Sequence, residues 1–162
     1  MPDLPIEDVL PALRHALAEG RNALLTAAPG AGKTTRVPLA LLDAPWLDGK
    51  KLLMLEPRRL ATQAAAHRMA ASLGESVGGT VGYRMKLDTR VGPTTRIEVV
   101  TEGILSRLLQ HDPALSEYAI VLFDEFHERS LQADTGLALC LEAQRIFRPG
   151  SPPARDVGDV GL

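Results

Sequence analysis

Short apolar runs alternate with amphipathic segments along most of the 162-residue chain, and this order constrains the fold more than any other feature. Helices are expected at residues 6–17, 33–42, 59–73, 102–110 and 131–145. Strands are expected at residues 22–26, 51–56, 80–85, 96–101 and 119–123. Most of these runs are continuously apolar, which is typical of parallel strands that are covered on both faces. We therefore predict an α/β domain with a mostly parallel sheet and helices on both faces.

The composition is that of one globular domain and limits the kinds of site it can carry. Hydrophobic residues make up 45% of the chain and the net charge is −2, which argues against a diffusely basic nucleic-acid binder. A single cysteine excludes a disulfide framework and a multi-cysteine zinc site. The N-terminus carries acids where a signal peptide needs basic residues, and no apolar stretch approaches about 18 residues. We expect a cytoplasmic protein with no membrane segment.

A glycine-rich segment follows the first expected strand, at the end of a strand where ligands bind in open α/β sheets. Residues 27–34 form a phosphate-binding loop in which Ala27 replaces the first glycine of the general pattern. The loop lets backbone N–H groups and the next helix start face an anion, while Lys33 reaches the phosphates and Thr34 ligates Mg²⁺. The alternative, an ordinary glycine-rich turn, does not explain the Lys-Thr pair at this place.

Two adjacent acids, Asp124 and Glu125, end the last apolar strand. At a nucleotide site, Asp124 can hold Mg²⁺ through water, and Glu125 can orient or deprotonate the attacking water. Alone, the segment Asp124-Glu125-Phe126-His127 would be interpreted as a strand end followed by a helix cap. Together with the phosphate loop it predicts half of an NTPase site.

Four motifs occur in the order and approximate spacing of the DEAH-box helicases of superfamily 2. They are APGAGKTT at 28–35, EPRRL at 56–60, TEGIL at 101–105 and DEFHERS at 124–130. The phenylalanine at position 126 of the last motif, in place of the more common alanine, resembles the pattern of the bacterial HrpB-type ATP-dependent helicases. The resemblance covers residues 4–148 and implies the first RecA-like lobe of an ATP-dependent RNA helicase, a P-loop NTPase fold.

The resemblance also implies roles for individual residues toward ATP and Mg²⁺. Asp124 and Thr34 would serve the metal, Glu125 would be the hydrolytic base, and His127 would couple the site to a second lobe. Lys33 would act on the phosphates, and Arg68 would stack on adenine, although a solvent-facing helical arginine is an equally good interpretation. The residues expected to bind the nucleotide are Pro29, Gly30, Ala31, Gly32, Lys33, Thr34, Thr35 and Arg68.

Single-stranded nucleic acid, with RNA as the expected kind, is the second partner that the resemblance implies. Arg58 and Arg59 match the first nucleic-acid motif, in which arginine and a helix N-terminus contact backbone phosphates. The stretch Thr101-Glu102-Gly103 matches the second motif, and a capped helix start is an equally good structural interpretation. Arg84 belongs to a local basic stretch for which a solvated hairpin is the alternative.

The motifs of a second lobe and the Ser-Ala-Thr motif of the first do not occur in this chain. We therefore expect residues 1–148 to form a RecA-like ATP-binding lobe that is incomplete at its C-terminus. Residues 149–162, rich in proline and glycine, are expected to be an irregular tail, for which we hypothesise a shifted reading frame; a natural tail is the alternative. The competing functional hypothesis is a catalytically silent fragment that binds only nucleotide or another protein, so whether this chain alone is an enzyme stays open.

Overall fold

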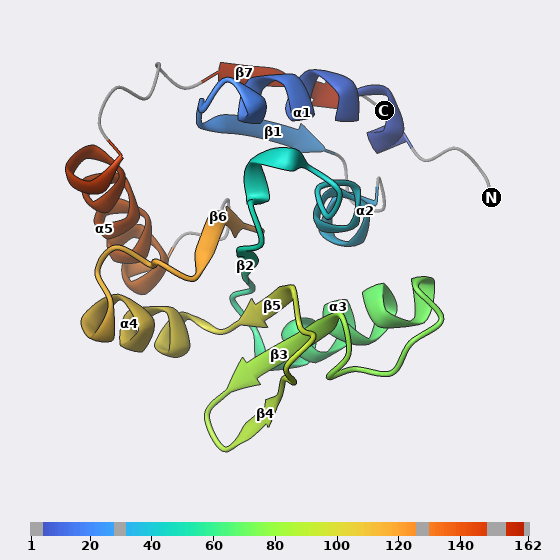
Figure 1. The fold of residues 1–162 in the computed structure, drawn as a ribbon, viewed down its shortest axis with the longest axis vertical. Helices are drawn as coiled ribbons and strands as arrows, with labels where there is room; N and C mark the ends of the chain where they lie inside the picture. The colour runs from blue at the N-terminus through green and yellow to red at the C-terminus, as the bar shows by residue number, and fades with distance from the viewer. Residues whose placement is uncertain (1–4, 28–31, 126–129, 149–154, 161–162) are drawn as a thin grey trace. The chain divides into compact units, whose positions relative to one another are not determined.

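The computed structural model describes residues 5–27, 32–125, 130–148 and 155–160 (Figure 1). The chain divides into two compact units. Unit 1 comprises Met1–Trp46 and Gly150–Leu162, and unit 2 comprises Leu47–Pro149. A short 3-10 helix, η2 (Pro45–Leu47), lies where the chain passes from one unit to the other.

A five-stranded sheet is the centre of unit 2, with the strand order β4-β3-β5-β2-β6. Strands β3, β5, β2 and β6 are parallel, and only β4 runs antiparallel, as the second arm of a hairpin with β3. The mostly parallel sheet expected from the sequence is confirmed, while β4 was not expected as a strand. The strands are β2 (Lys51–Leu55), β3 (Val81–Met85), β4 (Asp88–Arg90), β5 (Ile97–Val100) and β6 (Tyr118–Phe123).

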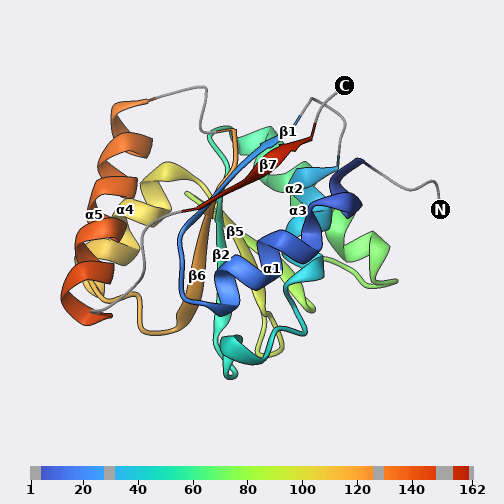
Figure 2. The same ribbon diagram turned by 90° about the horizontal axis from the view of Figure 1, so that it is seen from above.

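In the described part of unit 2, three helices cover both faces of the sheet. They are α3 (Arg59–Ser72), α4 (Glu102–His111) and α5 (Leu131–Phe147). Figure 2 shows α4 and α5 on one side of β5, β2 and β6, and α3 on the other side. Leu53 and Leu55 of β2 pack with Leu105 of α4 in one core cluster. Leu52 and Met54 are also buried and point to the opposite face, because successive strand residues alternate in direction.

The described residues of unit 1 include two parallel strands, β1 (Ala23–Ala27) and β7 (Arg155–Val160). Its helices are η1 (Pro5–Asp8), α1 (Leu10–Ala18) and α2 (Lys33–Ala40). The prediction of an irregular tail is wrong for residues 155–160, which pair with β1 from Ala23 to Ala27. Strand pairing is made by backbone groups, so a segment without apolar periodicity can form a strand when a partner is present. The other tail residues lie outside the described residues.

None of the helices in the described part of the chain combines the length and the apolar character that crossing a membrane requires.

Candidate nucleotide and nucleic-acid sites

The end of the predicted phosphate-binding loop lies in unit 1, where Gly32 precedes the first turn of α2. Gly32 has a φ of 93°, in the left-handed region, and its carbonyl accepts a hydrogen bond from the Arg36 N–H at 2.8 Å. A side chain at this position would be strained, so glycine is required there. The next residues, Lys33, Thr34 and Thr35, form the first helical turn, where N–H groups point outward and the helix dipole favours an anion. Pro29, Gly30 and Ala31 lie outside the described residues.

Ion pairs hold α2 to the N-terminal helices of unit 1. The Arg36 Nε donates to Glu7 Oε1 of η1 at 2.6 Å. At the other end of α2, Arg14 of α1 donates to the carbonyl oxygen of Ala40 and, at 2.8 Å, to Asp43 Oδ1. The hydrogen bond and charge of Arg14 hold the pKa of Asp43 below its ordinary value. These contacts fix the direction of the helix that begins with Lys33 and Thr34.

The acidic pair Asp124 and Glu125 forms a turn directly after β6 in unit 2. The Asp124 N–H donates to the carbonyl oxygen of Leu55 in β2 at 3.1 Å, which ties the turn to the neighbouring strand. Glu125 has a φ of 52°, a left-handed conformation that L-residues adopt at a cost. Such strained residues cluster at functional sites, where the surrounding structure holds them. His127 and Phe126 lie outside the described residues.

Three of the four sequence motifs begin at the same edge of the unit 2 sheet. Leu55, the last residue of β2, lies opposite Val100 of β5 on one side and Phe123 of β6 on the other. The Glu56 N–H donates to the Val100 carbonyl oxygen at 3.0 Å. The motifs 56–60, 101–105 and 124–130 therefore leave adjacent parallel strands at their carboxyl ends, where ligands bind in open α/β sheets.

The arginine pair of the first nucleic-acid motif lies exposed at the start of α3. Arg58 is the residue that precedes the helix, and its carbonyl oxygen accepts hydrogen bonds from Thr62. Arg59 Nη1 donates to the carbonyl oxygen of Lys86, in the turn between β3 and β4, at 3.1 Å. Arg68, predicted to stack on adenine, is exposed on the same helix two to three turns later. The structure therefore places Arg59 beside a second basic residue in the hairpin turn.

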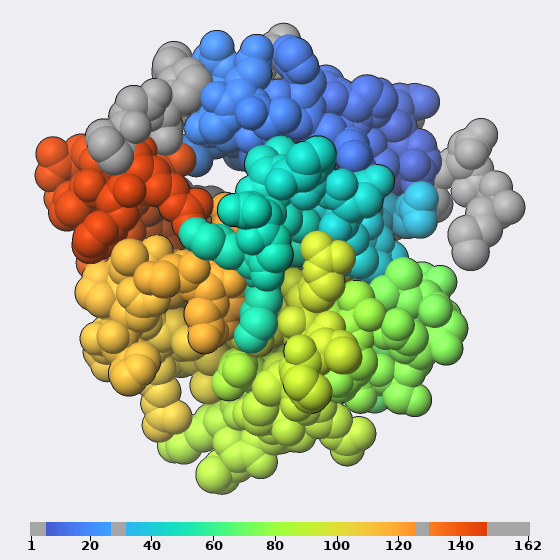
Figure 3. Space-filling model, in the orientation of Figure 1, coloured from blue at the N-terminus to red at the C-terminus, as the bar shows by residue number. Residues whose placement is uncertain are grey.

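The hairpin of β3 and β4 is anchored to α3 by a buried phenol and an acid. Tyr83 is 1% exposed, and its hydroxyl donates to Asp88, with oxygen-to-oxygen distances of 3.0 and 3.1 Å to the two carboxylate oxygens. Gln63 of α3 donates to Asp88 Oδ2 at 2.9 Å. In this basic stretch β3 and β4 form an antiparallel hairpin, and Leu87 in its turn is 97% exposed. Figure 3 shows this part of unit 2 in yellow-green at the surface.

The second nucleic-acid motif forms the first turn of α4. Thr101 precedes the helix in an extended conformation, and its side chain makes no capping hydrogen bond within the described part of the chain. Gly103 is exposed, and a Cβ added to it would meet nothing within 4 Å. The carboxylate of Glu102 accepts a hydrogen bond from the Ser130 hydroxyl at 2.7 Å. Thr101 is half-buried, and the space beside Gly103 is open.

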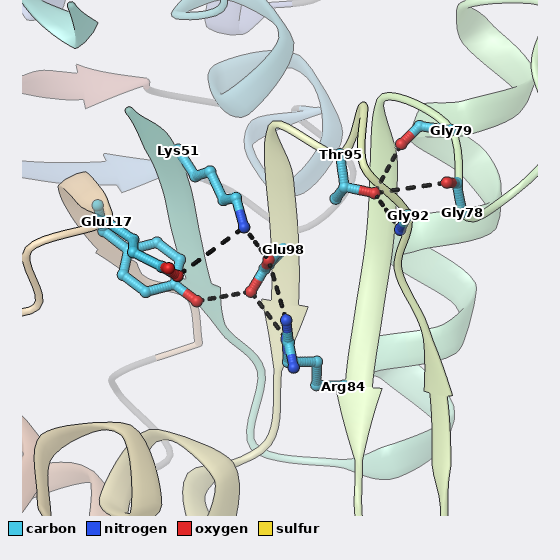
Figure 4. A network of polar contacts seen from close by, with 9 residues as sticks. Lys51, Gly78, Gly79, Arg84, Gly92, Thr95, Glu98 and Glu117 are labelled. Atoms are coloured by element: carbon cyan, nitrogen blue, oxygen red, sulfur yellow. Dashed lines mark hydrogen bonds and ion pairs between the residues drawn. The ribbon is translucent and has the colours of Figure 1, made fainter. Parts of the chain in front are cut away.

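Arg84 contributes to a polar network inside the sheet rather than to the exposed hairpin turn (Figure 4). Its Nε lies 3.0 Å from Glu98 Oε2. Glu98 is fully buried, and it also accepts hydrogen bonds from Lys51 Nζ at 3.0 Å and from the Tyr118 hydroxyl at 2.6 Å. This network gives Arg84 a structural role, and sequence reasoning missed Glu98. The signal was an acid within a four-residue apolar strand, since a buried charge needs partners.

The four network members come from four different strands, and the network shifts the pKa values of Glu98 and Tyr118. Burial would raise the pKa of Glu98, but hydrogen bonds from Tyr118, Arg84 and Lys51 outweigh it and leave the pKa below its ordinary value. Burial and the neighbouring Glu98 carboxylate raise the pKa of the Tyr118 phenol. Glu98 is therefore ionised at neutral pH and holds β2, β3 and β6 to β5.

No group of three or more histidine, cysteine, aspartate or glutamate side chains that could hold a metal ion occurs in the described ranges. Mg²⁺ commonly keeps few protein ligands, so a Mg²⁺ ion held by one carboxylate, one hydroxyl and phosphate oxygens does not need such a group.

Comparison with known proteins assigns the chain to a family. The family model described as DEAD/DEAH box helicase matches residues 9–149. The chain is 53% identical over 148 residues to the ATP-dependent RNA helicase HrpB of Escherichia coli (strain K12), covering 91% of this chain and 18% of that protein. It is 36% identical over 128 residues to the ATP-dependent RNA helicase HrpA of Borreliella burgdorferi (strain ATCC 35210 / DSM 4680 / CIP 102532 / B31), covering 78% and 16%.

Solved structures show the same relationship. The crystal structure of the E. coli DExH-box NTPase HrpB superimposes with a TM-score of 0.86 at 50% identity, covering 96% of this chain and 19% of that one. A second crystal structure, of the Escherichia coli DEAH/RHA helicase HrpB, gives a TM-score of 0.85 at 48% identity, covering 98% and 20%. The chain thus spans about a fifth of the length of these relatives. The family model, the relatives and the fold agree that this chain belongs to the DEAD/DEAH box helicase family.

Proposed function

We propose that this chain is the ATP-binding RecA-like lobe of a DEAH-box ATP-dependent RNA helicase, in which nucleotide hydrolysis is coupled to remodelling of nucleic acid. One observation carries the proposal: motifs for hydrolysis and for nucleic-acid contact leave neighbouring parallel strands β5, β2 and β6 at one sheet edge. In such a fold that edge is where ligands bind. Events at the acidic turn and at the two nucleic-acid motifs can therefore affect each other through a shared sheet.

For the nucleotide, we propose that the loop ending at Gly32 and the first turn of α2 receive the phosphates. Lys33 supplies positive charge to them, and Glu125 orients or deprotonates the attacking water. Thr34 and Asp124 would hold Mg²⁺, for which a hydroxyl and a carboxylate are suitable oxygen ligands. When bound, the metal neutralises charge on the phosphate oxygens. His127 and the remaining loop residues Pro29, Gly30, Ala31 and Thr35 keep the roles that the family implies, as does Arg68.

For the nucleic acid, we propose a single strand, with RNA as the expected kind, bound along its backbone. Arg58 and Arg59 are exposed and can donate hydrogen bonds to phosphates. The Thr101 hydroxyl makes no helix-capping hydrogen bond and can also donate to a phosphate. The open space beside Gly103 allows a sugar-phosphate backbone to approach closely. Arg84 is engaged by Glu98, and this gives its proposed nucleic-acid contact no support.

The nucleotide assignment is tested by replacing Lys33 with Ala and measuring binding of ATP with Mg²⁺ by isothermal titration calorimetry. We expect binding to be lost, because Lys33 supplies the positive charge nearest the phosphates. Lys50→Ala is the matched control, since Lys50 is exposed and lies outside every motif. Equal affinity in the Lys33 variant and the wild type would remove the basis of the proposal.

A further inference from the structure

A hydrogen bond links the second nucleic-acid motif to the last residue of the acidic motif. The Ser130 hydroxyl donates to Glu102 Oε1 at 2.7 Å. The same hydroxyl accepts a hydrogen bond from the Ala133 N–H at 2.9 Å and so caps the N-terminus of α5. Glu102 is the first residue of α4 and directly follows Thr101. One side chain therefore joins the start of α4, which lies in the motif 101–105, to the start of α5, which follows the motif 124–130.

The two helices are also held together by close apolar packing beyond this hydrogen bond. A Cβ added at Gly136 of α5 would come within 3.0 Å of Leu105 Cδ2 of α4. Leu105 and Ala133 belong to the same buried cluster. Closely packed cores transmit strain between their elements. A displacement of the start of α4 would therefore also displace the start of α5.

The chemistry of Glu102 argues against direct contact with the nucleic acid. A carboxylate repels phosphate groups, so its side chain is unsuited to the role that Arg58 or Thr101 can fill. A hydrogen bond from a hydroxyl to a carboxylate is charge-assisted and stronger than one between neutral groups. A negative charge in the first turn of α4 is also favoured by the helix dipole. Glu102 is thus suited to holding Ser130.

We propose that Glu102 is a positioning residue that couples nucleic-acid binding at the start of α4 to the acidic motif. The acidic motif is held at both of its described ends: the Asp124 N–H bonds to Leu55, and Ser130 bonds to Glu102. Occupation of the α4 start by a nucleic-acid strand would move or fix Ser130, the last residue of the acidic motif, through the Glu102 carboxylate. This inference rests on the proposed function, because it requires that the chain binds both ligands.

The test measures how a non-hydrolysable ATP analogue with Mg²⁺ changes the affinity of this chain for a fluorescently labelled oligouridylate. The ratio of the two dissociation constants is the coupling factor, for which about 5- to 150-fold is typical of coupled sites. We expect Glu102→Ala to bring the factor to near one. Glu102→Gln should retain most of it, because the amide oxygen still accepts the Ser130 hydroxyl. A purely structural role would change both affinities without changing their ratio.

A second variant keeps the inference testable if Glu102→Ala does not fold. Ser130→Gly removes the hydroxyl donor, and glycine at a helix N-cap costs only a few tenths of a kcal/mol. It should lower the coupling factor as Glu102→Ala does. Glu142→Gln, on an exposed part of α5 where Glu142 pairs with Arg145, is the matched control and should keep the wild-type factor.

The outcomes separate this inference from the proposed function. If the wild-type chain binds neither the analogue nor the oligouridylate, the proposed function fails, and this inference fails with it. If the wild type binds both and Glu102→Ala keeps the full coupling factor, only this inference is overturned. A wild-type factor of one, or a Glu102→Gln variant that behaves like Glu102→Ala, also overturns it.

Discussion

At the scale of single residues, Glu98 connects four strands of the unit 2 sheet through its side-chain contacts. Glu98 lies on β5, in the strand order β3-β5-β2-β6. Its carboxylate contacts side chains from the two neighbouring strands, β3 and β2, and from β6, the strand beyond β2. A buried ion pair costs desolvation, and what it adds is a definite partner for each charge. The network therefore stabilises one strand arrangement through partners that are far apart in the sequence.

Replacing Glu98 with Gln should destabilise the fold strongly. The change leaves Lys51 and Arg84 without a buried counter-charge, and breaking such a pair typically costs about 3–5 kcal/mol. Both cations are about a third exposed, with 29% and 33% of their side-chain surface accessible, so we expect a loss toward the lower end of that range. Urea unfolding at neutral pH measures this loss, with Glu142→Gln as the exposed control, which should leave the free energy of unfolding close to that of the wild type.

The pH dependence of that difference follows from the lowered pKa of Glu98. A group whose pKa is lowered by folding contributes stability above its unfolded pKa and loses it as the pH falls through the folded value. Glutamate has an ordinary pKa of 4.5. The difference in unfolding free energy between the wild type and Glu98→Gln should therefore be largest at neutral pH and decrease as the pH falls below about 4. A gap that stays constant from neutral to acid pH contradicts the assigned ionisation.

Gly103 offers a prediction in which stability and binding change in opposite directions. A methyl group at this exposed helical position meets nothing within 4 Å, so Gly103→Ala should stabilise the chain by about 0.4–1 kcal/mol by restricting the unfolded state. If a nucleic-acid backbone packs there, the same methyl should weaken oligouridylate binding about tenfold, within the 1–3 kcal/mol cost of overpacking. Thermal unfolding and fluorescence anisotropy measure the two effects. Unchanged binding would show that the space beside Gly103 is not used.

At the scale of elements, the hairpin of β3 and β4 is held by contacts to α3 and to the loop before β5. Asp88 joins Tyr83 to Gln63, and Arg59 bonds to the carbonyl oxygen of Lys86. Behind the hairpin, the buried Thr95 hydroxyl donates to the Gly79 carbonyl oxygen at 2.8 Å and accepts from the Gly92 N–H at 2.9 Å (Figure 4). The hairpin therefore presents its exposed turn in a fixed position relative to the start of α3.

Gly82→Ala should disrupt this hairpin. A Cβ on Gly82 would clash with the carbonyl oxygen of Arg90, and it would lie 2.9 Å from the Val91 Cγ1. Because the first of these is a backbone atom, relief requires β4 to shift, and we expect a loss of about 1–3 kcal/mol in unfolding free energy. Gly103→Ala makes the same chemical change in open space and serves as the control. Equal stability of the two variants would contradict the packing described for Gly82.

At the scale of the whole molecule, the net charge of −2 limits the electrostatic attraction between the chain and a nucleic acid. With 20 acidic and 18 basic residues, the chain as a whole does not attract a polyanion, so affinity must come from a few local phosphate contacts. Such contacts release counterions and make the affinity depend on salt concentration. Binding should accordingly be weak in moderate salt and insensitive to base sequence.

Replacing Arg58 and Arg59 together with Ala should reduce that salt dependence. On single strands, each neutralised phosphate contributes about −0.7 to the slope of log affinity against log salt concentration. We expect the slope to become less steep by about 0.7 for each phosphate that the variant no longer neutralises. The affinities for oligouridylate and oligoadenylate should fall by the same factor. A decrease confined to one base sequence would indicate contacts to bases instead.

The sequence by itself determined most of the elements, the family and the motifs of this protein, because these depend on periodicity and spacing over a few neighbouring residues. The start of α2 at Lys33 and of α3 at Arg59 coincides with the first residue of each expected helix. The mostly parallel α/β fold and the helicase family predicted from the motifs are confirmed. The residue roles at the nucleotide and nucleic-acid sites remain predictions.

Only the tertiary structure decided which distant residues meet. Glu98 pairs with Lys51, 47 positions away, and Ser130 with Glu102, 28 positions away, and neither pair shares an element. The strand at 155–160 formed against β1, over 130 residues earlier in the chain, although its composition suggested an irregular segment. Local patterns report the preference of a segment for helix or strand. They carry no information on the partner that satisfies a buried charge, a helix cap or an open strand edge, and that partner is chosen only when the chain packs.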